Sequence, residues 1–160
     1  MTNPNASPRL ADGAVLALRL GLAIVFVAHG SQKLFGMFGG GGISGTAKFF
    51  AFVGAHPGTF WAVVGGVAEF GGGLAVGLGL LSRAAAAVLA IDMVMAVVLY
   101  NADNGFFSEK ATGGWEINMV LACMALSVAL TGAGRVSADA VLHNRFGSDG
   151  WTGRVLNLAA

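Results

Sequence analysis

The chain has 160 residues, which is room for one domain. Hydrophobic residues make up 56% of the sequence and charged residues only 11%, whereas soluble domains carry about 25% charged residues, so a soluble enzyme fold and a disordered chain are excluded. The net charge is +1 without a run of lysine or arginine, which excludes the basic surface that binds nucleic acid. Because Cys123 is the single cysteine, an internal disulfide and a cysteine metal cluster are excluded too. The remaining class is a small integral membrane protein.

Four apolar segments approach the length of about 20 residues that a helix needs to cross the bilayer core. In chain order they cover about residues 14–36, 60–81, 83–100 and 115–131. The first segment is too long for a cleaved signal peptide and carries three ionisable residues, so we expect it to stay in the mature protein. The sequence therefore predicts one all-α domain over residues 1–160, a multi-pass integral membrane four-helix bundle in the lipid bilayer.

The connections between these segments fit the same division. Residues 37–59 are rich in glycine and then offer the apolar patch of residues 49–53, which we expect to form a short interfacial segment between the first two helices. We expect residues 82–83 to form a tight turn and residues 132–160 to form a hydrophilic tail. Gly73 and Gly77 show the small-xxx-small spacing that lets membrane helices approach closely. This spacing predicts tight packing of the second helix against the third, and the glycine-rich faces also suit a homodimer.

Lysine and arginine are distributed unequally over the two sides of the predicted bundle. The side of both termini and of the turn near residue 82 holds five arginines: Arg9, Arg83, Arg135, Arg145 and Arg154. The opposite side holds three lysines: Lys33, Lys48 and Lys110. Positively charged residues gather on the cytoplasmic side of membrane proteins. We therefore expect a protein of the cell (cytoplasmic) membrane with both termini in the cytoplasm.

Several ionisable residues fall inside the predicted helices, where each costs at least ~2.5 kcal/mol on insertion scales. With about 100° per residue, Arg19, His29 and Lys33 occupy an arc of roughly 80° on the first helix. They form one polar stripe, which must face the bundle or a water-filled cavity. The second helix contributes Glu69 and the third contributes Asp92. Charges at such positions indicate a functional site.

Opposite charges lie at similar depths along these helices. The rise of ~1.5 Å per residue places Arg19 roughly 8–9 Å and Asp92 roughly 13 Å from the cytoplasmic boundary, so the two can meet. It also places His29 and Lys33 near two acidic residues, Glu69 and Glu116. His29 is a candidate proton carrier, because the charge of histidine changes near physiological pH. The alternative interpretation is a ladder of ion pairs that fixes the helix register without any chemistry.

A set of short motifs follows the same order along the chain. They are Arg19-Leu20-Gly21, His29-Gly30-Ser31-Gln32-Lys33-Leu34-Phe35-Gly36, Glu69-Phe70-Gly71-Gly72, Asp92, Asn104-Gly105-Phe106-Phe107, Gly113-Gly114-Trp115-Glu116-Ile117-Asn118 and Gly132-Ala133-Gly134-Arg135-Val136-Ser137-Ala138-Asp139. In this order and spacing they resemble the DoxX family of small four-helix membrane proteins. The resemblance covers about residues 14–142, and Ala133 stands where the family has a proline.

The resemblance implies a redox role in the membrane. Members of this family are linked to thiosulfate:quinone oxidoreduction and to a membrane oxidoreductase complex with superoxide dismutase and a thiosulfate sulfurtransferase. The sequence carries no flavin, haem or iron–sulfur motif and no redox cysteine pair. Electron transfer would therefore use a quinone or the cofactor of a soluble partner protein, and we expect neither a covalent cofactor nor a metal.

We accordingly expect the chain to be the membrane subunit of a quinone-linked oxidoreductase system for thiosulfate, sulfur or oxidative-stress redox chemistry. The expected catalytic residues are His29, Glu69 and Asp92. The residues expected to bind the quinone are Arg19, Gln32, Lys33, Glu116 and Asn118. Two other functions stay open. One is a non-catalytic scaffold that docks soluble redox partners through the arginine-bearing tail, and the other is a pathway for a small solute or protons through the polar bundle interior.

Overall fold

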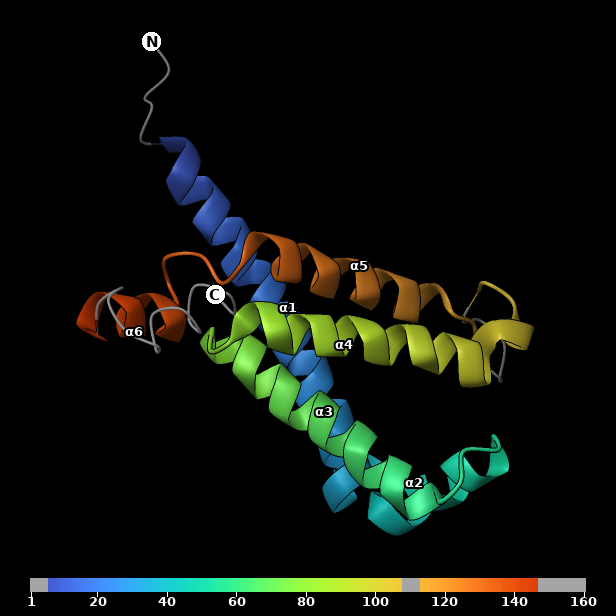
Figure 1. Cartoon of the computed structure of the whole chain (residues 1–160). Helices are drawn as coiled ribbons and strands as arrows, with labels where there is room; N and C mark the ends of the chain where they lie inside the picture. Colours follow the sequence, from blue (N-terminus) through green and yellow to red (C-terminus); the bar gives the residue numbers. More distant parts are fainter. Residues whose placement is uncertain (1–5, 108–112, 147–160) are drawn as a thin grey trace.

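The computed structural model describes residues 6–107 and 113–146, which are folded almost wholly into helices (Figure 1). The longer helices are α1 (Ala6–Phe35), α2 (Gly42–Phe52), α3 (Gly58–Leu78), α4 (Ser82–Ala96), α5 (Glu116–Thr131) and α6 (Ala138–Phe146). Short helical turns follow α1 and α4: η1 (Met37–Gly39), η2 (Val97–Asn101) and η3 (Ala102–Asn104). No strand occurs in this described part, and the predicted all-α class is confirmed. The α2 helix is the short segment expected between the first two long helices.

Three helical stretches of the described part are long and apolar enough to cross a membrane: Arg9–Phe35, Gly58–Leu78 and Ser82–Asn104. They correspond to the first three predicted helices. The first helix begins at Ala6 rather than near residue 14, and the third stretch continues past Tyr100 through a π-helical turn. The fourth helix, α5, has 16 residues. Its length is about 24 Å at 1.5 Å per residue, which is less than the roughly 30 Å of a bilayer core.

The helices form two antiparallel pairs, α1 with α3 and α4 with α5 (Figure 1). The pairs meet near the turn that joins α3 to α4, and these two helices diverge from the turn. This turn covers residues 79–81 and not the predicted residues 82–83, because Ser82 and Arg83 already belong to α4. The α2 helix packs against the beginning of α3. The buried core lies where the two pairs meet and includes Leu22, Phe26, Val76, Leu89 and Val128. Away from this core, α3 and α4 are separated, which leaves room for a site between them (Figure 1).

Close packing of α1 against α3 depends on glycines. A Cβ atom at Gly30 would collide with the backbone of Phe70, so the two helices approach here to a distance that a side chain would prevent. Gly73 and Gly77 also face α1, and Cβ atoms at these positions would lie 3.0 Å and 2.8 Å from atoms of that helix. The sequence-based assignment of this glycine pair to the contact with α4 is therefore corrected, because Gly72 faces α4 instead.

Candidate functional site

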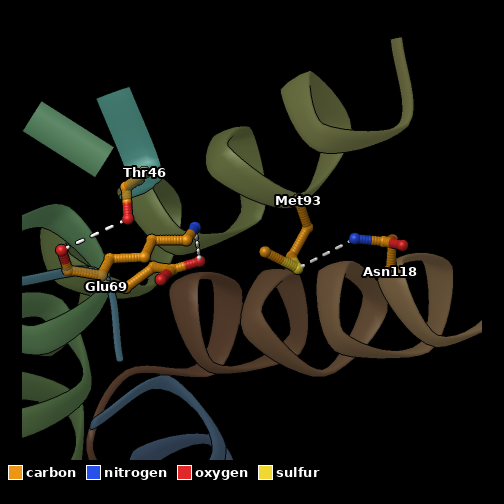
Figure 2. Close-up of polar contacts among 5 residues, drawn as sticks. Thr46, Glu69, Met93 and Asn118 are labelled. Atoms are coloured by element: carbon orange, nitrogen blue, oxygen red, sulfur yellow. Dashed lines mark hydrogen bonds and ion pairs between the residues drawn. The ribbon is translucent and has the colours of Figure 1, made fainter. Parts of the chain in front are cut away.

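A lysine of α1 and a glutamate of α3 form an ion pair where these helices pack closely. Lys33 Nζ lies 2.6 Å from Glu69 Oε1, and the Glu69 side chain is only 4% exposed. The α2 helix is attached at the same point, because the Thr46 hydroxyl donates a hydrogen bond to the backbone carbonyl of Lys33 (3.3 Å; Figure 2). The structure thus brings Lys33 and Glu69 together, as their depths in the helices predict.

Asp92 of α4 completes this group. Its carboxyl group interacts electrostatically with both Glu69 and Lys33. Glu69 Oε2 and Asp92 Oδ2 are buried, and neither atom has a hydrogen-bond partner in the described part of the chain. Two carboxyl groups and one ammonium group from three helices therefore meet at membrane depth. We call Lys33, Glu69 and Asp92 the acid–lysine cluster.

A cavity of about 510 Å³ lies between α3 and α4, on the side of α2. Its walls are mostly apolar and include Phe50, Trp61, Val64, Ile91, Met95 and Leu99. Among the described residues that line it, only His56 and Asp92 are titratable. Val64, Ile91 and Met95 are also exposed on the outer surface, Ile91 to 63%. The cavity therefore opens sideways, toward the lipid, and reaches the acid–lysine cluster through Asp92.

His56 and Trp61 line this cavity although the sequence analysis assigned neither to a site. His56 is exposed in the loop between α2 and α3, and an isolated loop histidine gives no functional signal in a sequence. A weaker signal was present in the aromatic residues Phe60 and Trp61, which begin an apolar segment as aromatic residues do at a membrane boundary.

Arg19 lies at the other end of the bundle, near the turn between α3 and α4. Its guanidinium donates hydrogen bonds of 2.7–2.9 Å to four backbone carbonyls, those of Val76, Gly77, Ala133 and Val136. Its charge interacts with Asp139 of α6. The predicted pairing of Arg19 with Asp92 is therefore wrong. The reason is that the end of α3 supplies two of the carbonyl oxygens, while the segment after α5 folds back over α1 and supplies the other two together with the acidic partner.

His29 and Gln32 lie on the same helix as Lys33 but outside the acid–lysine cluster. His29 is exposed and interacts electrostatically with Lys33, while the Gln32 side chain donates a hydrogen bond to the Phe38 carbonyl (3.3 Å). On the polar stripe, Lys33 lies between Arg19 and His29. Because Arg19 and Lys33 face the interior, His29 at the far edge of the stripe reaches the surface. Its expected contact with acidic residues is not observed in the described part.

The α5 helix forms a second polar contact beside the cluster. Asn118 donates a hydrogen bond to Met93 Sδ (3.6 Å; Figure 2) and accepts one from Asn101 (2.9 Å). Met93 follows Asp92 in α4, so this contact joins α5 to the helix that carries the cluster. Glu116 is partly buried in the first turn of α5. For Glu116 and Asn118, contact with a cofactor stays a prediction.

Comparisons with known proteins agree with the motifs of the sequence. The DoxX family model matches residues 14–102. A protein of Mycobacterium tuberculosis (strain ATCC 25618 / H37Rv), described as "uncharacterized membrane protein Rv3486", is 34% identical over 154 residues, which cover 86% of this chain and 89% of that protein. No solved structure matches the chain significantly. With more than half of its length matched by the family model, and with a relative of this similarity, the chain belongs to the DoxX family of membrane proteins.

Proposed function

We propose that this chain is the membrane subunit of a quinone-linked oxidoreductase system and that it binds the quinone in the cavity between α3 and α4. The observation that carries the proposal is an apolar cavity that opens toward the lipid and has the Asp92 carboxyl group in its lining. Its volume of about 510 Å³ lies within the roughly 300–1,000 Å³ of small-molecule sites. A lipid-soluble ligand can enter such a cavity from the bilayer without crossing water.

The lining fits a flat apolar ring that carries polar oxygen atoms. Phe50 and Trp61 offer aromatic surface for stacking. The Asp92 carboxylate accepts a hydrogen bond from a quinol hydroxyl, and its protonated form donates one to a quinone oxygen. Lys33 and Glu69 form an ion pair, and both interact electrostatically with the Asp92 carboxyl group. A bound quinone supplies two-electron, two-proton redox chemistry, for which the chain provides the apolar walls and a carboxyl group that holds a proton.

A soluble partner protein would supply the electrons to the quinone, because the sequence of this chain carries no redox cofactor motif. The structure gathers the beginning of α1, the turn between α3 and α4 and the segment after α5 at one end. There the Arg135 backbone N–H donates a hydrogen bond to Asp12 (3.1 Å), and Arg135 and Arg145 are exposed. By the positive-inside rule, we assign this end to the cytoplasm, where a soluble partner would dock.

The test is quinone binding by the purified full-length protein in lipid nanodiscs. A short-chain quinone is titrated while quenching of tryptophan fluorescence is followed, and Trp61→Phe identifies the signal from the cavity. Asp92→Asn should weaken binding about 10-fold or more, because a hydrogen bond to a charged group contributes about 1.5–3 kcal/mol and ~1.4 kcal/mol corresponds to tenfold. Asp103→Asn is the matched control, since Asp103 is exposed and outside the cavity lining.

A second variant tests the cavity without changing charge. Ala68 lines the cavity, and Ala68→Phe fills it with an apolar side chain. This variant should lose binding while its thermal unfolding shows that it is folded. Wild-type affinity in both Ala68→Phe and Asp92→Asn would contradict the proposed function.

A further inference from the structure

The acid–lysine cluster has an imbalance of charge that no neighbouring side chain corrects within residues 6–107 and 113–146. With both carboxyl groups ionised, Glu69 and Asp92 carry two negative charges against the single positive charge of Lys33. Lys33 Nζ lies 2.6 Å from Glu69 Oε1, so the ammonium group is already committed to one carboxylate. Ionised groups at membrane depth are costly unless they are paired. A second ionised carboxylate beside the first adds like-charge repulsion to this cost.

Polar groups on the neighbouring helices are occupied elsewhere. The Thr46 hydroxyl of α2 donates to the carbonyl of Lys33, and the Asn118 amide of α5 donates to Met93 Sδ. His29 of α1 interacts with Lys33 but is exposed. Each of these groups therefore has a contact other than the free carboxyl oxygens.

Two buried carboxyl oxygen atoms lie where an additional proton would be stabilised. Glu69 Oε2 and Asp92 Oδ2 are hydrogen-bond acceptors without a donor in the described part of the chain. A buried acceptor left unpaired is destabilising. A proton on either carboxyl group creates a donor for the other. The same proton also makes the sum of charges in the cluster zero.

We propose that Glu69 and Asp92 together carry one exchangeable proton, which makes the acid–lysine cluster an electrically neutral proton-binding site at the junction of α1, α3 and α4. Loading forms an O–H bond between a proton from water and a carboxylate oxygen, and release breaks that bond and restores the carboxylate. Exchange runs through the cavity, because Asp92 and the exposed His56 both line it. This site goes beyond quinone binding, since the charge count holds with an empty cavity.

Infrared difference spectroscopy of the full-length protein in nanodiscs, without added quinone, tests the proposal. A protonated carboxyl group has a C=O band separate from that of a carboxylate, and the band moves to lower frequency in D₂O. We expect the band of one buried carboxylic acid at neutral pH in the wild type. Asp92→Asn and Glu69→Gln should each lose it, because the remaining carboxylate is neutralised by Lys33. Asp103→Asn should keep it.

Lys33→Met gives the opposite result and makes the test specific. Without the ammonium group, both carboxyl groups must be protonated to remain neutral, so the band should reach about twice its wild-type intensity. A wild type without the band, or a band that persists in both carboxyl variants, would overturn the proposal. Loss of the wild-type band on addition of Na⁺ at constant pH would also overturn it, in favour of a metal cation. These outcomes are independent of quinone titration, so either proposal can fail without the other.

Discussion

Replacement of Arg19 by methionine distinguishes a structural from a cofactor-binding role for this residue. Arg19 is 1% exposed and donates four hydrogen bonds to backbone carbonyls. Methionine fills a similar volume but donates nothing. The carbonyl oxygens of the α3 end and of the segment after α5 would then be buried without this donor.

The magnitude follows from the number of lost bonds. The Val76 carbonyl keeps a hydrogen bond from the backbone N–H of Gly79 (3.1 Å), so three carbonyls lose their donor. An unpaired buried acceptor costs about 1–3 kcal/mol, so these three amount to about 3 kcal/mol at the lower end of this range. Asp139 would lose its cationic neighbour in addition. Arg19→Lys should fall between methionine and the wild type, because one ammonium nitrogen cannot reach carbonyls on two sides as the planar guanidinium does.

The assay is denaturant and thermal unfolding in detergent, followed by circular dichroism, with quinone binding measured on the same samples. Arg9→Met is the control, because Arg9 is exposed on the same helix. We expect severe destabilisation by Arg19→Met and wild-type stability for the control. A folded Arg19→Met protein with unchanged stability and lost binding would refute the structural role and restore the sequence-based assignment of Arg19 to the cofactor.

Three further predictions concern the ends and the packing of the helices. Asp139→Ala should lower the free energy of unfolding by about 1–2 kcal/mol, because Asp139 accepts hydrogen bonds from the backbone N–H groups of residues 81 and 82 at the start of α4. Asp12→Ala removes an exposed hydrogen bond and should have a smaller effect in the same melting assay. Gly30→Val should separate α1 from α3 and weaken their packing, whereas Gly71→Ala should be tolerated, because a Cβ atom there meets nothing within 4 Å. Expression level and melting temperature measure the effect of each variant. Equal behaviour of the two variants would contradict the packing described. Reporter fusions at both termini should indicate the cytoplasm, and a fusion between η3 and α5 should indicate the opposite side. An odd number of crossings would contradict this topology.

The ion pair of Lys33 with Glu69 is a feature that sequence reasoning predicts well. Apolar segments fix the depth of each charged residue, and a helix fixes the direction in which it points. These two constraints are enough to bring a lysine near the end of one helix to a glutamate in the next. The same reasoning fails for His29, because the edge of a polar stripe is buried or exposed according to a small rotation of the helix.

Other parts of the site depend on tertiary structure alone. The carbonyl oxygens that bind Arg19 are present at every residue, so a sequence contains no signal for which of them a buried arginine will reach. The cavity exists because α3 and α4 diverge from their common turn (Figure 1), and the angle between helices depends on packing that no single segment specifies. Asp92 could thus be identified as a buried charge, but not as a residue that lines a cavity.

The shortness of α5 has a consequence expected for the surrounding lipid. An aromatic group marks one end, where the ring centroid of Phe106 lies 4.8 Å from that of Trp115 and 5.1 Å from that of Phe107. A bilayer accommodates a short apolar helix by thinning beside it, at a cost of fractions of a kcal/mol per Å. We therefore expect the hydrocarbon next to α5 to be about 6 Å thinner than its average of roughly 30 Å. Lipids with long acyl chains should destabilise the protein, and thinner membranes bring water closer to the carboxyl groups of the acid–lysine cluster.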